Sequence, residues 1–110
     1  MDCLFCQIAA GEIPCRKVYE DDTMRAFYDI APKAPTHILL IPKCHIGGAD
    51  ELTEENAGVV AHIFAQIPKI AAAQGLSSYR VLTNTGVDAG QTVRHLHFHL
   101  LGGRVLGEMG

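Results

Sequence analysis

Short apolar segments bounded by turn residues dominate the first 42 residues of the chain. "CRKVYE" (15–20), "MRAFYDI" (24–30) and "THILLIP" (36–42) each predict a strand, because they are short and rich in strand-favouring residues. The acidic turn "EDD" joins the first two into a hairpin, and the prolines of "APKAP" separate the second from the third. Ahead of them, "CLFCQIAAGE" (3–12) predicts a short helix that ends at Gly11.

The pattern changes to a helical period after residue 52. Thr53 suits a helix N-cap, and Glu54 and Glu55 would then lie in the first turn, where negative charge is favourable. Apolar residues recur at spacings of three and four, which predicts one buried helix face. This face consists of Val59, Val60, Ile63, Phe64, Ile67, Ile70 and Ala71. Pro68 should kink the helix, and Gly75 should end it.

Two further strands are predicted in the C-terminal part, "YRVLTN" (79–84) and "RHLHFHLLG" (94–102). Strands joined mostly by hairpins, with one long and one short helix, indicate an α+β fold. The expected architecture is a five-stranded antiparallel sheet that carries its helices on one face. A length of 110 residues fits one domain, residues 1–110.

Composition and charge narrow the classes of partner. The chain is 48% hydrophobic and 19% charged, which is usual for a globular protein. A net charge of −3 and a pI near 6.0 argue against a nucleic-acid partner. No apolar run approaches the roughly 20 residues of a membrane span. The start "MDCLFCQIAAGE" lacks the basic region and cleavage site of a secretory signal, so we expect a cytoplasmic protein without membrane contact.

Three of the six histidines occur at every second position in "HLHFHLL" (95–101). Alternate side chains of a strand share a face, so His95, His97 and His99 should line one face, towards a cleft or solvent. The intervening apolar residues should pack beneath the long helix. Imidazole suits both a metal ion and a phosphate. The spacing alone leaves a metal site, a phosphate site and a chance arrangement open.

The loop before the histidines, "NTGVDAGQTV" (84–93), favours phosphate. Gly86 and Gly90 allow main-chain N–H groups to approach an anion closely. Asn84, Gln91 and Thr92 add neutral side-chain donors. Placed directly before three histidines on one face, this loop predicts a phosphate site.

The segment "GQTVRHLHFHLL" (90–101) resembles the signature of the histidine-triad (HIT) family, in which hydrophobic residues separate three histidines. "CQIAAGEIPCRKVYEDD", "AFYDIAPKAPTHILLIPKCHI" and "LTNTGVDAGQTVRHLHFHLLGGR" extend the similarity to the Hint branch over nearly the whole chain. The resemblance implies a homodimer whose two sheets join into one. It also implies purine nucleotide ligands and hydrolysis of nucleoside phosphoramidates, such as adenosine monophosphate joined to lysine.

The resemblance also assigns roles to single residues. It makes His97 the nucleophile that forms a nucleotidyl-histidine, and it makes His99, Gln91 and Thr92 the residues that hold the phosphate. Further nucleotide-site residues are Asn84, Gly90 and Val93, the ribose-binding acid Asp29, and the base pocket Phe5, Ile13, Phe27, Ile30 and Leu39. His95 completes the catalytic histidines, and His37 is expected to support them from behind. Asn84 could equally be a turn residue, and without the family Asp29 is better explained as a turn residue at the end of a strand. The apolar residues could simply be core.

The cysteine pair Cys3 and Cys6 raises the question of a metal. Some bacterial relatives bind structural zinc through this pair and two histidines, which match His45 and His95 here. Two thiolates and two imidazoles are a common zinc ligand set. Two reduced thiols packed among apolar residues are the alternative. Cys44 is left outside the site, and a redox pair is disfavoured because no thioredoxin-like pattern accompanies it.

Two other functions remain open at this point. A dinucleoside polyphosphate hydrolase would share the three histidines, and a nucleotide-binding scaffold protein would need no turnover. The chain departs from many Hint proteins because "GGRVLGEMG" carries no tryptophan-proline segment, which affects the expected preference for a leaving group.

Overall fold

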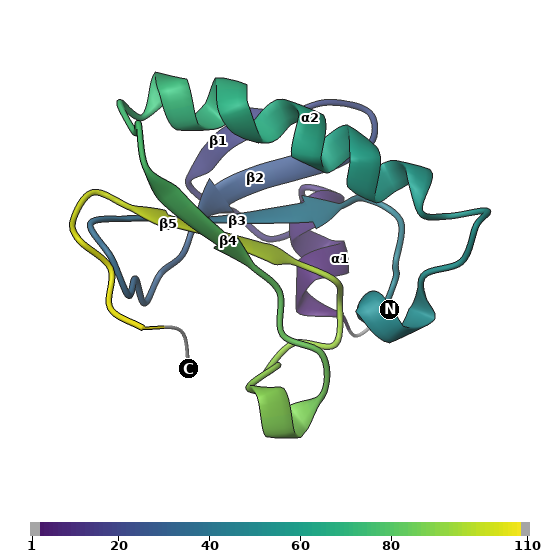
Figure 1. The fold of residues 1–110 in the computed structure, drawn as a ribbon. Coiled ribbons are helices and arrows are strands. Elements are labelled where there is room, and N and C mark those ends of the chain that lie inside the picture. Colours follow the sequence, from purple (N-terminus) through teal and green to yellow (C-terminus); the bar gives the residue numbers. More distant parts are fainter. Residues whose placement is uncertain (1–2, 109–110) are drawn as a thin grey trace.

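The computed structural model describes residues 3–108 as an antiparallel five-stranded sheet with helices on both faces (Figure 1). The helices are α1 (Leu4–Ala9) and α2 (Gly58–Ala73), and two short 3-10 turns cover Ala49–Glu51 and Val87–Ala89. The strands are β1 (Lys17–Glu20), β2 (Met24–Tyr28), β3 (Thr36–Pro42), β4 (Tyr79–Leu82) and β5 (Phe98–Gly102). The strand order is β1-β2-β3-β5-β4, and every neighbouring pair is antiparallel. The α+β prediction is therefore confirmed.

The central strand β3 is apolar on both faces, and this explains why both faces of the sheet are covered. Ile38 and Leu40 belong to the larger core under α2, while Leu39 and Ile41 belong to a second cluster with α1. Successive side chains of a strand point to opposite faces, so an unbroken apolar segment needs cover on each side. The expectation that both helices share one face was wrong, because α1 lies on the face opposite α2 (Figure 1).

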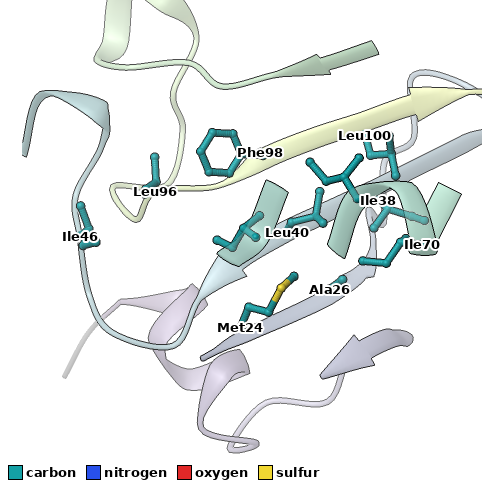
Figure 2. Close-up of a cluster of buried hydrophobic side chains, with 11 residues drawn as sticks. Met24, Ala26, Ile38, Leu40, Ile46, Ile70, Leu96, Phe98 and Leu100 are labelled. Atoms are coloured by element: carbon teal, nitrogen blue, oxygen red, sulfur yellow. The ribbon is translucent and has the colours of Figure 1, made fainter. Parts of the chain in front are cut away.

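The larger core lies between α2 and the sheet. Ile63, Ile67 and Ile70 of α2 are buried there, as the helical spacing predicted. Figure 2 shows their partners from the strands, together with Ile46 and Leu96 from the loops. Phe64 departs from the prediction, because 45% of its side chain is exposed at the rim while its ring edge meets Phe98.

The helix α2 begins at Gly58, five residues after the predicted cap. Thr53 instead caps a turn that precedes α2. Its N–H donates to Asn56 Oδ1 (2.7 Å), its Oγ1 accepts from the Asn56 N–H (3.3 Å), and its carbonyl accepts from the Ala57 N–H (2.9 Å). The reciprocal side-chain pair has the arrangement of a helix capping box, but the regular helix starts only at Gly58. Glu54 and Glu55 therefore lie outside α2.

The C-terminal end of α2 follows the prediction. The helix continues through Pro68 to Ala73, and the kink at Pro68 stays a prediction. Gly75 then adopts a positive φ of 74°, and the N–H of Leu76 donates to the Ala71 carbonyl at 2.9 Å. This arrangement satisfies the last helical carbonyls and turns the chain towards β4. No helix among residues 3–108 is long and apolar enough to cross a membrane.

The last strand is shorter than predicted, because β5 starts at Phe98 and not at residue 94. The N–H of Leu96 donates to the Ile46 carbonyl (2.6 Å), and the N–H of His95 donates to the Val93 carbonyl (2.8 Å). Leu96 therefore bonds to the loop that contains Ile46, and His95 bonds within its own segment, so neither N–H donates to a neighbouring strand. Only His99 of the three histidines lies within a strand.

The placement of two isoleucines yields a stability prediction. Ile63 is fully buried, whereas 99% of Ile30 is exposed. Ile63→Ala should lower the free energy of unfolding by about 2–5 kcal/mol through lost contacts and a cavity. Ile30→Ala should change it by less than about 0.5 kcal/mol. Denaturant titration measures both, and equal losses would contradict the proposed core.

Candidate functional site

A cavity of about 270 Å³ lies on the face of the sheet that carries α1. It is lined by Leu4, Phe5, Ile8, Phe27, Tyr28, Asp29, Ile30, Leu39, Thr92, Val93, His97 and His99. An apolar lining with a few convergent polar groups is typical of a small-molecule site. A larger hollow of about 540 Å³, between residues 75–80 and 103–106, carries none of the predicted site residues. The smaller cavity is therefore the candidate site.

Nine predicted nucleotide-site residues line this cavity, and the other predicted residues lie around it. Phe5, Phe27, Asp29, Ile30, Leu39, Thr92, Val93, His97 and His99 are in the lining. Ile13, His37, Asn84, Gly90, Gln91 and His95 are not. Leu4 and Ile8 were missed, although residues four apart on a helix share a face and their spacing on α1 could have indicated them. Tyr28 gave no periodic signal.

The histidines and the apolar residues between them point to opposite faces, as predicted, but two of the histidines are buried and not exposed to solvent. The apolar residues between the histidines point into the core under α2. His97 and His99 face the cavity. His95 is fully buried and His97 is only 5% exposed, so these two side chains do not form a solvated face. The reason is that α1 covers them, with Phe5 packed against both rings.

The ring of His97 has one nitrogen committed and one free. Its Nδ1 lies 2.7 Å from the main-chain carbonyl oxygen of His95. Because a carbonyl only accepts, Nδ1 must carry the proton, and Nε2 keeps its lone pair. Burial lowers the pKa of His97, so the ring is neutral at pH 7. A neutral imidazole with a free Nε2 at a cavity can act as a nucleophile or a base.

A second chain of hydrogen bonds sets the tautomer of His99. The N–H of Lys33 donates to His37 Nδ1 (3.0 Å), so the proton of His37 is on Nε2. This Nε2–H donates to His99 Nδ1 at 2.8 Å, which leaves His99 with its proton on Nε2. Burial, then the neighbouring His97 and His37, lowers the pKa of His99 to about 4. His99 is therefore a neutral donor, and His37 supports it from behind.

Asp29 lies both in a turn and at the cavity. Its Oδ1 accepts a hydrogen bond from the N–H of Ala31 (2.8 Å), as a residue in a turn would. Its Oδ2 lies 3.4 Å from His37 Nε2, and the residue lines the cavity. The carboxylate is therefore held beside the cavity by the turn and by the histidine chain.

The amide of Gln91 is used within the protein. Its Nε2 donates to the carbonyls of Gly47 (2.7 Å) and Val93 (3.0 Å). Its Oε1 accepts from the Gly86 N–H (2.9 Å) and from Arg94 Nη1 (3.0 Å). With two donors and two acceptor positions occupied, this buried amide ties the glycine loop to residues 46–48. Sequence reasoning could not foresee this, since the same residue type serves either purpose.

Cys3, Cys6, His45 and His95 form a compact cluster next to the cavity. Their ligand atoms all lie within 4.8 Å of one another. Cys6 Sγ lies 3.1 Å from His45 Nδ1, and His95 Nδ1 lies 3.3 Å from Cys3 Sγ and 3.4 Å from Cys6 Sγ. Sulfur and nitrogen ligands of a tetrahedral zinc ion are roughly 3.5 Å apart, from bond lengths of about 2.3 and 2.0 Å. The predicted ligand set is thus brought together at a suitable spacing.

The donor set of this cluster can hold a metal ion. His95 Nε2 lies 3.0 Å from the Pro42 carbonyl and must carry the proton, so Nδ1 faces the thiols with a lone pair. Burial and the neighbouring Cys3 raise the pKa of the Cys6 thiol to about 11, and a bound cation would reverse this effect. One potential ligand atom each of Asp29, His37 and His99 also lies within 4.8 Å of the other two. Hydrogen bonds already occupy both ring nitrogens of His37, so this second group is less suited to a metal ion.

Similar proteins share this architecture along nearly the whole chain. The family model described as "Scavenger mRNA decapping enzyme C-term binding" matches residues 2–108. A HIT-like protein of Synechococcus elongatus is 50% identical over 106 residues, which cover 96% of this chain and 93% of that protein. The purine nucleoside phosphoramidase of Escherichia coli K12 is 43% identical over 108 residues, which cover 96% of this chain and 91% of the enzyme.

Solved structures agree with these sequence relatives. A histidine triad protein from Clostridium difficile has a TM-score of 0.96 at 46% identity, covering 100% of this chain and 97% of that chain. A HIT family hydrolase from Clostridium thermocellum has a TM-score of 0.94 at 45% identity, covering 98% of this chain and 96% of that chain. Three alternate histidines, two of them at a cavity, and similarity over almost the full length lead to one conclusion. The chain belongs to the histidine-triad (HIT) family.

Proposed function

We propose that the protein is a hydrolase that cleaves purine nucleoside phosphoramidates, such as adenosine monophosphate joined to an amine. The observation that carries the proposal is the free Nε2 of His97 at the cavity, with its Nδ1–H fixed on the His95 carbonyl. The similarity to the purine nucleoside phosphoramidase of Escherichia coli supports the same substrate class.

The proposed reaction has two displacements at phosphorus. In the first, Nε2 of His97 attacks the α-phosphorus, the amine nitrogen takes up a proton from solvent, the phosphorus–nitrogen bond breaks, and the neutral amine leaves. In the second, water attacks the phosphorus and releases the nucleotide from His97. Charge develops on the phosphoryl oxygens in both steps. The Nε2–H of His99 is a donor with a fixed tautomer, on a ring whose centroid lies 5.0 Å from that of His97.

The remaining lining residues would hold the nucleoside. Phe5, Phe27 and Leu39 offer an apolar surface for a flat base. The carboxylate of Asp29 can accept hydrogen bonds from the two ribose hydroxyls. Thr92 lies in the same lining and would contact the phosphate, while Gln91 would act indirectly by shaping the loop.

The nucleophile prediction separates this proposal from a binding or scaffold role. His97→Ala should reduce turnover of an adenosine phosphoramidate by several orders of magnitude while AMP binding changes by a modest factor. Rapid quench and mass spectrometry should locate a phosphorus-linked adduct on His97 in the unmodified protein. His62→Ala is the matched control, because His62 lies on α2 and contacts Asp21 at 2.7 Å.

Two outcomes would contradict this proposal. Near-normal turnover by His97→Ala, or an adduct on another histidine, would remove His97 as the nucleophile. Faster turnover of a diadenosine polyphosphate than of the phosphoramidate would instead favour the dinucleoside polyphosphate hydrolase.

We also propose that Cys3, Cys6, His45 and His95 hold one zinc ion. Protein purified without chelators should contain about one zinc per chain. Cys3→Ser should lower both the zinc content and the melting temperature, because the metal joins α1 to residues distant in sequence. Cys44→Ser is the control, since this exposed thiol lies outside the cluster. A zinc-free protein whose stability is unaffected by Cys3→Ser would support a packed thiol pair.

A homodimer is the third part of the proposal. β4 ends the strand order, so one of its edges has no partner strand among residues 3–108. Pairing two such edges would join the sheets and cover Tyr79, which is 39% exposed. Sedimentation at micromolar concentration should give about twice the chain mass of 11.9 kDa. A monomer throughout the micromolar range would contradict this assembly.

A further inference from the structure

We propose that the metal centre positions the nucleophile: metal bound by Cys3, Cys6, His45 and His95 keeps His97 in the tautomer whose Nε2 is free. The part of this inference that concerns catalysis rests on the proposed function. It goes beyond a metal that only stabilises the fold. Two residues, His95 and Phe5, connect the four ligands to the ring of His97 by separate sets of contacts.

The first set of contacts passes through His95 itself. Its ring Nδ1 belongs to the ligand cluster, while its main-chain carbonyl accepts the Nδ1–H of His97 at 2.7 Å. One residue therefore holds the metal with its side chain and the nucleophile with its backbone. His95 is fully buried, and its ring is fixed on the far side by the Pro42 carbonyl at 3.0 Å. A shift of this ring would move the carbonyl that sets the tautomer of His97.

The second set of contacts passes through Phe5, which stands between Cys3 and Cys6 in the sequence. Its ring meets the rings of both His95 and His97 edge to face, with centroids 6.1 Å and 4.9 Å away. The helix that carries it, α1, has only six residues, and so short a helix is not stable alone. Cys3 also caps α1, because its Sγ accepts from the Cys6 N–H at 3.3 Å. A metal on both thiols would fix α1, and hence Phe5, against the nucleophile.

The chemical consequence concerns the two tautomers of a neutral imidazole. His97 can attack only when its proton is on Nδ1, and the bond to the His95 carbonyl selects that form. Without a fixed partner, the ring exchanges between both tautomers and between orientations. Loss of an outer-shell contact at a metal site typically costs about 10–100-fold in metal affinity or activity, and we expect an effect of this size on kcat here. The affinity for the nucleotide should fall less than kcat, because Phe27 and Leu39 of the sheet also line the cavity and do not depend on α1.

The first test removes the metal through its most exposed ligand. The side chain of His45 is exposed and outside both apolar clusters, so His45→Ala should lose metal with little loss of core packing. Cys44→Ser, which changes the neighbouring exposed residue, is the control. Metal content, kcat on an adenosine phosphoramidate and AMP affinity are measured well below each melting temperature. Two-bond nitrogen–proton spectra of the imidazole rings report the tautomer of His97 directly.

The expected result for metal-free His45→Ala is a mixture of His97 tautomers, a kcat reduced about 10–100-fold and AMP affinity within a few-fold of the original. Cys44→Ser should match the unmodified protein. A folded, metal-free His45→Ala protein with one His97 tautomer, or with unchanged kcat, would overturn the proposal. The spectra need no substrate, so they decide the tautomer even if the loaded protein fails to cleave phosphoramidates. That failure would count against the proposed function alone.

A second variant applies if His45→Ala does not fold. Phe5→Leu keeps all four ligands and removes the ring between them and His97; because this ring also lines the cavity, AMP affinity is measured beside kcat. The metal-loaded variant should retain its zinc and show altered His97 ring signals together with a reduced kcat. Unchanged ring signals in this variant would overturn the second set of contacts and, without a folded metal-free protein, the proposal itself.

Discussion

The hydrogen bond from His97 Nδ1 to the His95 carbonyl is the interaction on which the chemistry of the site depends. At 2.7 Å, it places the proton of a neutral imidazole on the side away from the cavity. Burial keeps that imidazole neutral by lowering its pKa. The free Nε2 then results from one main-chain acceptor, so the position of residue 95 controls what residue 97 can do.

The two faces of the sheet divide stability from chemistry. Under α2, fully buried residues such as Ile38, Leu40 and Ile63 form a core without any histidine. On the other face, α1 covers a smaller cluster, which leaves room for the cavity and the thiol–imidazole site. The apolar segment of β3 makes this division possible because it contributes to both faces (Figure 1). The short helix α1 is accordingly the element that the proposed zinc ion would stabilise most.

The strands and the long helix could be predicted from the sequence, because the alternation or helical spacing of buried residues marks them. Most cavity residues were predicted only through the resemblance to the HIT family, because an apolar residue at a site and one in the core have the same pattern. The errors arose where hydrogen bonds outside the regular helices and strands decide the local structure. Thr53 makes the reciprocal bonds of a helix cap with Asn56, but the turn that it caps precedes α2. The histidine segment alternates like a strand, yet the Leu96 N–H bonds the Ile46 carbonyl and delays β5. Gln91 was expected at the phosphate, but its orientation follows from loop contacts that sequence spacing does not encode.

The stereochemical course at phosphorus tests the central claim most directly. Each in-line displacement inverts the configuration at phosphorus, so attack by His97 followed by attack by water gives overall retention. A phosphorothioate analogue of the phosphoramidate with known configuration, hydrolysed in isotopically labelled water, reveals the outcome in the product. Retention is the result expected if His97 Nε2 forms a covalent intermediate. Inversion would mean that water attacks the substrate directly, and it would contradict the role assigned to His97.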